Sequence, residues 1–451
     1  MHLTLDLNPQ FTKALDLMEH TRKHIFVTGR AGTGKSTLLT YFREHTDKNI
    51  VVLAPTGVAA VNVKGQTIHS FFGFKPDITV AKVKKLKPHG KGDLYKKLDT
   101  IVIDEISMVR ADLLDCVETF LRLHGPDPTR AFGGVQMIMI GDLFQLPPVV
   151  GSDEREIFSE HYASPYFFSA HVFSPEHTLF GDIDGMTLEL IELEKIYRQK
   201  DHAFIELLNA IRSSTVTNAH IATMNTRHEP KYARRPDEYS ILLTTTNSLA
   251  GAMNEAELKR LSGDLFVYDS QVQGDFEDKY LPTEMELRVK IGAQVMLLNN
   301  DSQGRWTNGT IGKIVATSVD EDTKDDILHV ELEDAEVVDV RPHQWDIYKF
   351  QYNAKASQIE SNVVGSCIQY PIKLAWAVTI HKSQGKTFDR VVLDIGSGTF
   401  SPGQLYVALS RCTSFEGIVL KQPIMRRHIW TDRTVVDCMA SFQEKSEVVV
   451  E

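Results

Sequence analysis

Cysteine is scarce in this sequence, and long apolar runs are absent. The 451 residues include four cysteines, scattered without a CxxC pair: Cys116, Cys367, Cys412 and Cys438. This spacing argues against a disulfide framework and favours a reducing compartment, so we expect a cytoplasmic protein. No segment approaches the roughly 20 apolar residues of a membrane-spanning helix, and the N-terminus lacks a basic, apolar and cleavable signal. We therefore expect no membrane partner.

The chain also lacks an excess of positive charge. Its formal net charge of −11 argues against coating nucleic acid through overall charge, but leaves room for a local basic track. Residues 74–97 contain eight lysines and two aspartates, which is consistent with such a track and equally with a solvated loop. With 42% hydrophobic and 24% charged residues, the composition is typical of a globular protein, and the length suggests roughly three domains.

The first third of the chain alternates short β-rich runs with amphipathic stretches. The apolar runs HIFVT, NIVVLAPT, DTIVIDE and QMIMIGD end in small or acidic residues, and helical patterns such as STLLTYFREH lie between them. This alternation predicts a parallel sheet flanked by helices. Candidate ligand groups follow the strands, at the carboxyl edge where open α/β sheets bind ligands.

A second α/β unit follows, interrupted by a strand-rich segment. YSILLTTTN, LAWAVTIH, RVVLDIG and GIVLK repeat the pattern of strands that end in polar groups. From about residue 288 to 365 the runs are short and β-branched, and TNGT supplies an Asn-Gly turn. We interpret this segment as a small antiparallel β-barrel inserted into the second unit.

The segment GRAGTGKS, at residues 29–36, matches the phosphate-binding loop between a strand and a helix. Its glycines allow backbone N–H groups to face phosphate oxygens at a helix N-terminus. Lys35 is placed to reach the β- and γ-phosphates of ATP, and Ser36 to coordinate Mg²⁺. The expected nucleotide contacts are Gly29, Ala31, Gly32, Thr33, Gly34, Lys35, Ser36 and Thr37.

Two further strand ends complete the predicted catalytic site. IVIDEIS supplies Asp104, a magnesium ligand in our interpretation, and Glu105, a base for the attacking water. A small-molecule kinase needs no such base, whereas a hydrolase does. GDLFQLPP supplies Gln145, which is placed to contact the γ-phosphate and report its loss.

Two arginines lie farther along the chain, Arg198 in LEKIYRQ and Arg411 in YVALSRCTS. Charge that develops on a transferred phosphoryl group calls for a cation besides Lys35, and such an arginine is worth about 10³–10⁵ in rate. Arg198 alone is also consistent with a surface or salt-bridging role. If the second unit closes over ATP bound to the first, hydrolysis lets the two units part, as a linear motor requires.

The ordered segments resemble the motifs of a known family. They are GRAGTGKS, APTGVAAVNVKGQTIHSFFGF, DEISMVRADLLDCVE, GDLFQLPPV, LEKIYRQ, LTTTN, AVTIHKSQGKTFDRVVLD and YVALSRCTS. Together, from about residue 8 to 420, they resemble Pif-family DNA helicases, in the RecD-like branch of superfamily 1B. The resemblance implies two tandem RecA-like motor domains, one at 1–180 with a small insertion at about 74–98. It places the second at 181–288 and 366–451, with an SH3-like β-barrel inserted at 289–365.

The resemblance also implies an activity and partners. It implies ATP-dependent 5′-to-3′ translocation on single-stranded DNA, unwinding of 5′-tailed or forked duplexes, and action on G-quadruplexes and RNA–DNA hybrids in replication, repair, recombination or telomere maintenance. Gln10 matches the family's adenine-reading glutamine, and Gly385 in KSQGKT matches a motif between nucleotide and DNA. The near absence of the long extensions found in eukaryotic members fits a bacterial or phage protein, and we expect a monomer in solution.

Polar and aromatic residues near the strand ends form a candidate DNA track. Sequence-independent binding uses hydroxyls, amides and backbone N–H groups against phosphates, with aromatic rings as base platforms. Core packing is an equally good interpretation of Phe71 and Phe72, and His69 is also consistent with a structural histidine. We expect Pro147 to act with Pro148 in stiffening the loop after Gln145. The candidates are Thr56, Gly57, Thr67, His69, Phe71, Phe72, Pro148, Thr246, Asn247, Thr379, His381 and Lys382.

Two rival functions remain open from the sequence. An ATP-switched nucleic-acid clamp or remodelling ATPase would bind DNA and hydrolyse ATP without processive unwinding. A P-loop kinase would transfer phosphate to an acceptor, but Glu105, Gln145 and the second α/β unit argue against it. Two units that each carry polar strand ends favour the helicase.

Overall fold

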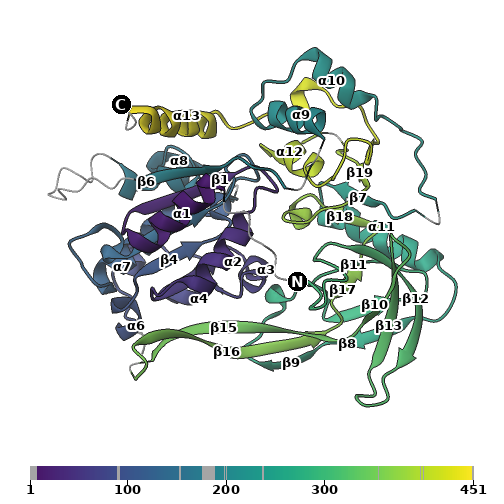
Figure 1. Cartoon of the computed structure of the whole chain (residues 1–451), viewed down its shortest axis with the longest axis horizontal. Coiled ribbons are helices and arrows are strands. Elements are labelled where there is room, and N and C mark those ends of the chain that lie inside the picture. The colour runs from purple at the N-terminus through teal and green to yellow at the C-terminus, as the bar shows by residue number, and fades with distance from the viewer. Residues whose placement is uncertain are drawn as a thin grey trace.

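The computed structural model describes most of the chain, in these ranges: residues 8–88, 92–151, 154–174, 188–197, 199, 201–235, 238–353, 355–396, 398–399 and 401–448. They form two α/β lobes and a strand-rich insertion that extends along one side of both (Figure 1). The predicted α/β class with two RecA-like motor lobes is confirmed. Across the described ranges, no helix is both long and apolar enough to cross a membrane.

The first lobe is built on a six-stranded parallel sheet with the order β3-β2-β4-β5-β1-β6. The strands are β1 (His24–Gly29), β2 (Ile50–Ala54), β3 (Gln66–Thr67), β4 (Thr100–Ile103), β5 (Gln136–Ile140) and β6 (Leu188–Leu193). Neighbouring residues of β1 face opposite sides: Ile25 and Val27 pack in one core, and Phe26 packs in the other. Both faces are therefore covered, as a parallel sheet requires.

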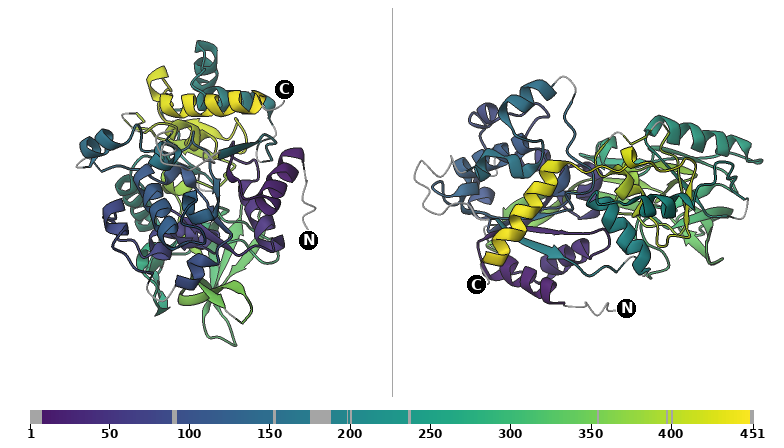
Figure 2. Two further views of the ribbon diagram at one scale, coloured as in Figure 1. Left: turned by 90° about the vertical axis from the view of Figure 1, so that its left-hand side faces the viewer. Right: turned by 90° about the horizontal axis from the view of Figure 1, so that it is seen from above.

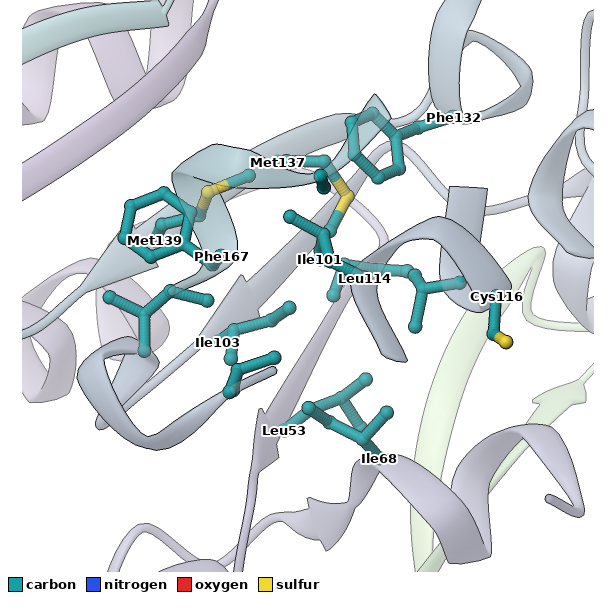
Figure 3. Close-up of a cluster of buried hydrophobic side chains, with 14 of the residues drawn as sticks. Leu53, Ile68, Ile101, Ile103, Leu114, Cys116, Phe132, Met137, Met139 and Phe167 are labelled. Carbon is teal, nitrogen blue, oxygen red and sulfur yellow. The ribbon is translucent and has the colours of Figure 1, made fainter. Parts of the chain in front are cut away.

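Helices cover each face of this sheet. α1 (Pro9–His20) and α2 (Lys35–His45) contribute to one core, and α7 (Ala111–His124) contributes to the other. Figure 3 shows part of the second core, in which side chains from β2, β4 and β5 pack together: Leu53, Ile101, Ile103, Met137 and Met139, with Leu114 of α7 and Phe167. Other helices of the lobe are α3 (Gly57–Asn62), α4 (Ile68–Phe72), α5 (Val80–Val83), α6 (Gly92–Lys96) and α8 (Arg155–His161).

The second lobe has a four-stranded parallel sheet with the order β18-β7-β19-β20. The strands are β7 (Ile241–Thr244), β18 (Ala377–Thr379), β19 (Val391–Leu393) and β20 (Ile418–Leu420). Its helices are α9 (His202–Arg212), α10 (Asn218–Asn225), α11 (Asn247–Arg260) and α12 (Gln404–Leu409). The chain leaves this sheet after α11 and returns at β18, so everything between is an insertion.

The insertion is rich in antiparallel strands. A five-stranded sheet has the order β14-β13-β12-β11-β17, beside a two-stranded β10-β8 sheet and a three-stranded β15-β16-β9 sheet. The strands are β8 (Phe266–Asp269), β9 (Gln271–Gly274), β10 (Glu286–Val289), β11 (Gln294–Leu297), β12 (Ile311–Val319), β13 (Asp326–Leu332), β14 (Val337–Val340), β15 (His343–Asn353), β16 (Gln358–Gln369) and β17 (Ile372–Leu374). The segment therefore exceeds the predicted limits of 289–365, and its SH3-like classification stays a prediction.

The β15–β16 hairpin connects the insertion to the first lobe. Phe350 of β15 is buried in the core of that lobe, where its ring lies 6.2 Å from the ring of Phe71. The backbone N–H of Ile359 donates to the side-chain oxygen of Asn49 at 3.0 Å. Figure 1 shows the hairpin reaching beneath the first lobe. The insertion thus contacts both lobes.

Two predicted domain limits are wrong. The first lobe does not end at residue 180, because β6 pairs in parallel with β1 from His24 to Gly29. The second lobe does not extend to the C-terminus, because α13 (Arg433–Val448) packs on the first lobe. Val435 and Met439 of α13 are buried in that core, and the rings of Phe26 and Phe442 lie 6.3 Å apart. Figures 1 and 2 show α13, in yellow, crossing onto the first lobe.

The lysine-rich stretch is a folded part of the first lobe. Val83, Leu94 and Tyr95 are buried in its core, and the Tyr95 hydroxyl donates to the carbonyl of Phe71 at 2.8 Å. The described lysines of this stretch are exposed. Apolar side chains therefore anchor the lysine-rich stretch in the first lobe, while its described lysines remain in solvent.

Candidate nucleotide and DNA site

The phosphate-binding loop joins β1 to α2. Gly34 adopts a left-handed backbone with φ of 90° and caps α2, and a side chain there would also press on the ring of Phe11. Ser36 and Thr37 lie in the first turn of α2. The loop therefore presents a helix N-terminus with hydroxyl groups, which suits bound phosphate and Mg²⁺.

Lys35 is the cation of this loop. Its Nζ donates to the carbonyls of Gly29 at 2.7 Å and Arg30 at 3.1 Å. Burial lowers its pKa, and the charges of Asp142 and Glu105 act in the opposite direction. The ammonium group of Lys35 thus lies among carboxylates. The N–H groups that it donates to the two carbonyls can instead donate to phosphate oxygens when a nucleotide binds.

The acidic pair follows β4. Burial raises the pKa of Asp104, and the charge of Lys35 opposes that rise. Glu105 has a left-handed backbone with φ of 52°. Burial and the charge of Asp104 raise the pKa of Glu105 to about 7, against the lowering effects of Lys35 and Arg411. A carboxyl group that titrates near neutral pH is suited to general-base work.

Gln145 is buried at the contact between the lobes. Its Nε2 donates to Oδ2 of Asp142 at 3.2 Å. Gln384, from the KSQG turn of the second lobe, donates through Nε2 to Oε1 of Gln145 at 3.0 Å and to Oε2 of Glu105 at 3.3 Å. Gln384 therefore joins the predicted γ-phosphate contact to the predicted base, a role that its sequence position did not reveal.

Two other residues at this contact were missed by sequence reasoning. The hydroxyl of Tyr406 accepts from the Ala31 backbone N–H at 3.2 Å and donates to Asp142 at 3.4 Å. Arg212 of α9 donates to Oδ1 of Asp142 at 3.2 Å, and its guanidinium lies 4.0 Å from the centre of the Phe144 ring. The sequence carried one signal, an aspartate at the end of β5, but none for its partners.

Arg411 is a buried second-lobe cation that interacts electrostatically with Glu105. Its side chain is 1% exposed, and its Nε donates to the carbonyl of Val407 at 2.9 Å. It is near enough for its charge to lower the pKa of Glu105. Arg198 lies outside the described residues, but Gln199 donates to the carbonyl of Ser410 at 3.2 Å.

The adenine end of the predicted site lies near α1. Gln10 donates to Glu194 at 3.1 Å, and Asn8 donates to the hydroxyl of Tyr197 at 3.3 Å. The ring of Tyr197 lies beside Gly34, and this side chain is 44% exposed. An exposed aromatic face beside the loop is a further candidate for base stacking, which the sequence analysis missed.

The candidate DNA residues differ in exposure. Thr56 caps α3, Thr246 caps α11, and both side chains are exposed together with those of Asn247 and Lys382. Gly57 is half-buried. These five lie at carboxyl ends of strands in the two sheets, where a nucleic-acid backbone has access to them.

Three other predicted site residues are His69 in α4 and, on either side of Gln384, His381 and Gly385. His69 and His381 are half-buried, and burial lowers the pKa of His381. Gly385 is exposed and adopts a left-handed backbone with φ of 79°, immediately after Gln384. The turn that contacts Gln145 therefore also carries two predicted DNA residues, His381 and Lys382.

Several predicted DNA contacts are wrong in this structure because the side chains are buried. Phe71 and Phe72 are 0% and 4% exposed and pack in the core, so neither ring is available to a base. Thr67 is 8% exposed and caps α4, while Thr379 is 3% exposed and accepts from the Lys382 N–H at 3.3 Å. Pro148 is buried too.

Replacing Phe71 by alanine tests the corrected assignment. We expect a loss of about 3–5 kcal/mol in the free energy of unfolding, because a fully buried ring leaves a cavity. Chemical denaturation measures this loss, and the milder Phe71→Leu serves if the alanine variant does not fold. DNA affinity per folded molecule should stay within about twofold. Normal stability with DNA binding weakened by the roughly 1–3 kcal/mol of a lost base stack would restore the platform interpretation.

Comparisons with known proteins agree with this geometry. The PIF1-like helicase family signature matches residues 7–221, and that of the UvrD-like helicase C-terminal domain matches residues 374–414. The chain is 32% identical over 427 residues to the ATP-dependent DNA helicase Pif1 of Bdellovibrio bacteriovorus, covering 92% of this chain and 88% of that protein.

Solved structures of Bacteroides Pif1 are also similar. The complex with ADP-AlF4 has a TM-score of 0.86 and 34% identity, with 98% of each chain covered. The complex with single-stranded DNA has a TM-score of 0.66 and 35% identity, with 98% of each chain covered. The overall arrangement of this chain is closer to the former. The identity to the Bdellovibrio helicase extends over most of both chains, so this chain belongs to the PIF1-like helicase family.

Proposed function

We propose that this chain moves 5′ to 3′ along single-stranded DNA and unwinds the duplex ahead of it. As a PIF1-like helicase it is an ATP-dependent DNA helicase, and direction is the finer statement proposed here. The observation that carries the motor mechanism is the contact of second-lobe groups with the phosphate-binding loop and the base. Tyr406 reaches Ala31, and Gln384 reaches both Glu105 and Gln145.

Each residue has a defined task in this proposal. Lys35 exchanges its bonds to the Gly29 and Arg30 carbonyls for phosphate oxygens, and Glu105 accepts a proton from the attacking water. Arg411 stabilises negative charge that develops on the transferred group. Loss of that charge weakens the attraction of the second lobe for the site and lets the lobes part.

Mg²⁺ supplies neutralisation of phosphate charge when bound, and the residues that would hold it are Ser36 and Asp104. A hydroxyl and a carboxylate fit this ion, which usually takes one or two carboxylates and completes its shell with substrate phosphates and water. In the described part of the chain, no group of three or more acidic, histidine or cysteine side chains could hold a metal by itself. The nucleotide is therefore needed to complete the site.

The KSQG turn supplies the coupling between nucleotide and DNA. Gln384 contacts the nucleotide side, while His381 and Lys382 begin the same turn and include an exposed cation. A change in the Gln145 contact therefore displaces predicted DNA contacts within three residues. This short path supports motion along DNA in preference to a static clamp.

The proposed substrates are single-stranded DNA and 5′-tailed or forked duplexes. Bacteroides Pif1 has been solved with single-stranded DNA and at forked double-stranded DNA. Action on G-quadruplexes and RNA–DNA hybrids, and a monomeric state in solution, extend the proposal by family resemblance. Contacts to the backbone of a single strand do not depend on base sequence, so the same motor can act on varied substrates.

Paired duplexes with a 5′ or a 3′ single-stranded tail test the proposal. With ATP and Mg²⁺, strand displacement should occur on the 5′-tailed substrate, whereas the 3′-tailed substrate should remain intact. ATP hydrolysis stimulated by DNA without displacement of either substrate would instead establish the clamp. Displacement on the 3′ tail alone would reverse the proposed direction.

Tyr406→Phe tests the contact between Tyr406 and the phosphate-binding loop. The Ala31 N–H is the donor that a phosphate oxygen needs, and the Tyr406 hydroxyl occupies it at 3.2 Å. Removing a competing hydrogen bond worth about 1 kcal/mol should tighten ATP binding roughly fivefold. Titration with a fluorescent ATP analogue measures the change. Tyr162→Phe, which removes a hydroxyl bonded to Asp115 at 3.0 Å, is the control. Unchanged or weaker binding would contradict the proposed competition.

A further inference from the structure

Three lysines converge where the insertion meets the second lobe. Lys373 lies on β17 and pairs with Met296 of β11, while Lys382 begins the KSQG turn and Lys386 follows it. The charged groups acting on Lys373 are the other two lysines and one carboxylate, Glu284. This lysine cluster, defined as Lys373, Lys382 and Lys386, therefore has excess positive charge at the junction.

The fold holds the lysine cluster in place. Lys386 donates through Nζ to the side-chain oxygen of Asn308, in the Asn-Gly turn predicted from the sequence. Gly309 in that turn has φ of 108°, and a Cβ there would lie 3.1 Å from the Cβ of Lys386. The missing side chain thus lets the insertion approach Lys386 closely. The partner of Lys386 is a neutral amide, so its charge is not neutralised by that contact.

Holding like charges together is unfavourable unless an anion joins them. Burial, Lys386 and Lys382 together lower the pKa of Lys373 to about 7, and burial lowers that of Lys386 to about 8. A nearby anion favours the charged form of each lysine and reverses this effect. An anion of compact charge with several acceptor oxygens fits three ammonium groups best, and a phosphodiester has these properties.

The lysine cluster continues the exposed DNA candidates of the second lobe. The Lys382 N–H donates to Thr379, whose hydroxyl lies 3.5 Å from the side-chain oxygen of Asn247. Toward the nucleotide, Arg411 donates to the carbonyl of Lys386 at 3.3 Å. Lys386 thus lies between the predicted DNA face and the arginine assigned to the γ-phosphate.

We propose that the lysine cluster binds a backbone phosphate of the DNA strand, so that the insertion and the second lobe grip the strand together. This inference rests on the proposed function and adds Lys373 and Lys386 to the DNA contacts. The contact carries no sequence information, because phosphodiesters are alike at every base. Lys386 would then bind the phosphate through its ammonium group while its backbone carbonyl accepts a hydrogen bond from Arg411.

Salt-dependent DNA binding tests the proposal in the full chain without ATP. Wild type, Lys373→Met, Lys386→Met and the double variant are titrated with a fluorescein-labelled oligothymidylate at several salt concentrations. The double variant should bind roughly tenfold more weakly near physiological salt. Its slope of log affinity against log salt should fall by about 0.7, the contribution of one single-strand phosphate contact. Unchanged affinity and slope would overturn the proposal.

Lys290→Met is the matched control, because Lys290 is a half-buried lysine of the insertion that donates to the Leu261 carbonyl at 2.8 Å. Its slope should equal that of wild type; an equal fall in both variants would show that any lost cation suffices and would overturn the proposal. If the cluster variants do not fold, acylation of wild-type lysines followed by mass spectrometry replaces them. Bound oligothymidylate should protect Lys373 and Lys386, and equal modification without it would overturn the proposal.

The two proposals fail separately. A wild-type chain that binds the oligonucleotide but displaces neither tailed duplex contradicts the helicase mechanism, while the salt slopes still decide the lysine cluster. Normal unwinding with unchanged slopes contradicts the lysine cluster alone.

Discussion

Replacing Glu105 by glutamine should lower ATP hydrolysis by about 10²–10⁴ while leaving nucleotide and DNA binding intact. Glutamine cannot accept the proton of the attacking water, which is the task assigned to this side chain. It keeps the shape of glutamate and an oxygen that can accept the bond from Gln384, 3.3 Å away in the native chain. Phosphate release under saturating ATP and single-stranded DNA measures the loss, and titrations in parallel establish binding.

The pH dependence gives a second measurement of the same assignment. The pKa of Glu105 is raised to about 7 by burial and by Asp104, so acid protonates the base within the neutral range. Wild-type kcat/KM for ATP should therefore fall about tenfold for each pH unit below 7, because this parameter follows the protonation of the nucleotide-free enzyme. The residual activity of Glu105→Gln should lack this fall. Glu360→Gln, on the exposed part of β16, is the control. Near-normal turnover in Glu105→Gln would exclude Glu105 as the base.

Replacing Arg411 by alanine should reduce DNA-stimulated hydrolysis by about 10³ or more. The charge of its guanidinium lowers the pKa of Glu105 from the second lobe, and arginines that stabilise a transferred phosphoryl group contribute about 10³–10⁵ in rate. In the proposed mechanism DNA binding moves the lobe that carries Arg411, so its loss should abolish the response to DNA more than it weakens ATP binding. The ratio of turnover with and without DNA measures this response.

The controls for Arg411 separate chemistry from folding. Arg411 is buried and donates to Val407 and Ser410, so the alanine variant is examined by thermal unfolding before its activity is interpreted. Arg411→Lys retains a charge within the lobe and should recover part of the stimulation. Arg390→Ala removes an arginine paired with Glu238 at the surface and should behave like wild type. Full stimulation in folded Arg411→Ala would show that the lobes do not share the site.

The proximity of Lys35 to Asp104 and Glu105 was predictable because these groups belong to short runs of consecutive residues. A strand, a glycine-rich turn and a helix supply Lys35 and Ser36 from one short segment. Asp104 and Glu105 likewise follow directly from an apolar strand. Parallel strands bring their carboxyl ends to one edge, so local patterns sufficed to predict which groups would meet.

The wrong predictions involve burial that depends on distant segments. FF in a strand-end motif is compatible with base stacking or with core packing. Core packing is the outcome because the ring of Phe71 packs against Tyr95 and against Phe350, and Phe350 belongs to a hairpin in the other half of the chain. The limit at residue 180 failed for the same reason, since β6 has ordinary strand character and only its pairing with β1 assigns it to the first lobe.

The sequence by itself determined the hydrolytic chemistry, the two α/β units and the strand-rich insertion, because each follows from local periodicity or from adjacent side chains. Only the tertiary structure decided that Tyr406, Arg212 and Gln384 reach the site from the second lobe, and that α13 packs on the first. Such contacts are small parts of the total packing energy of the lobes. They are set by how whole surfaces fit together, which no short segment encodes.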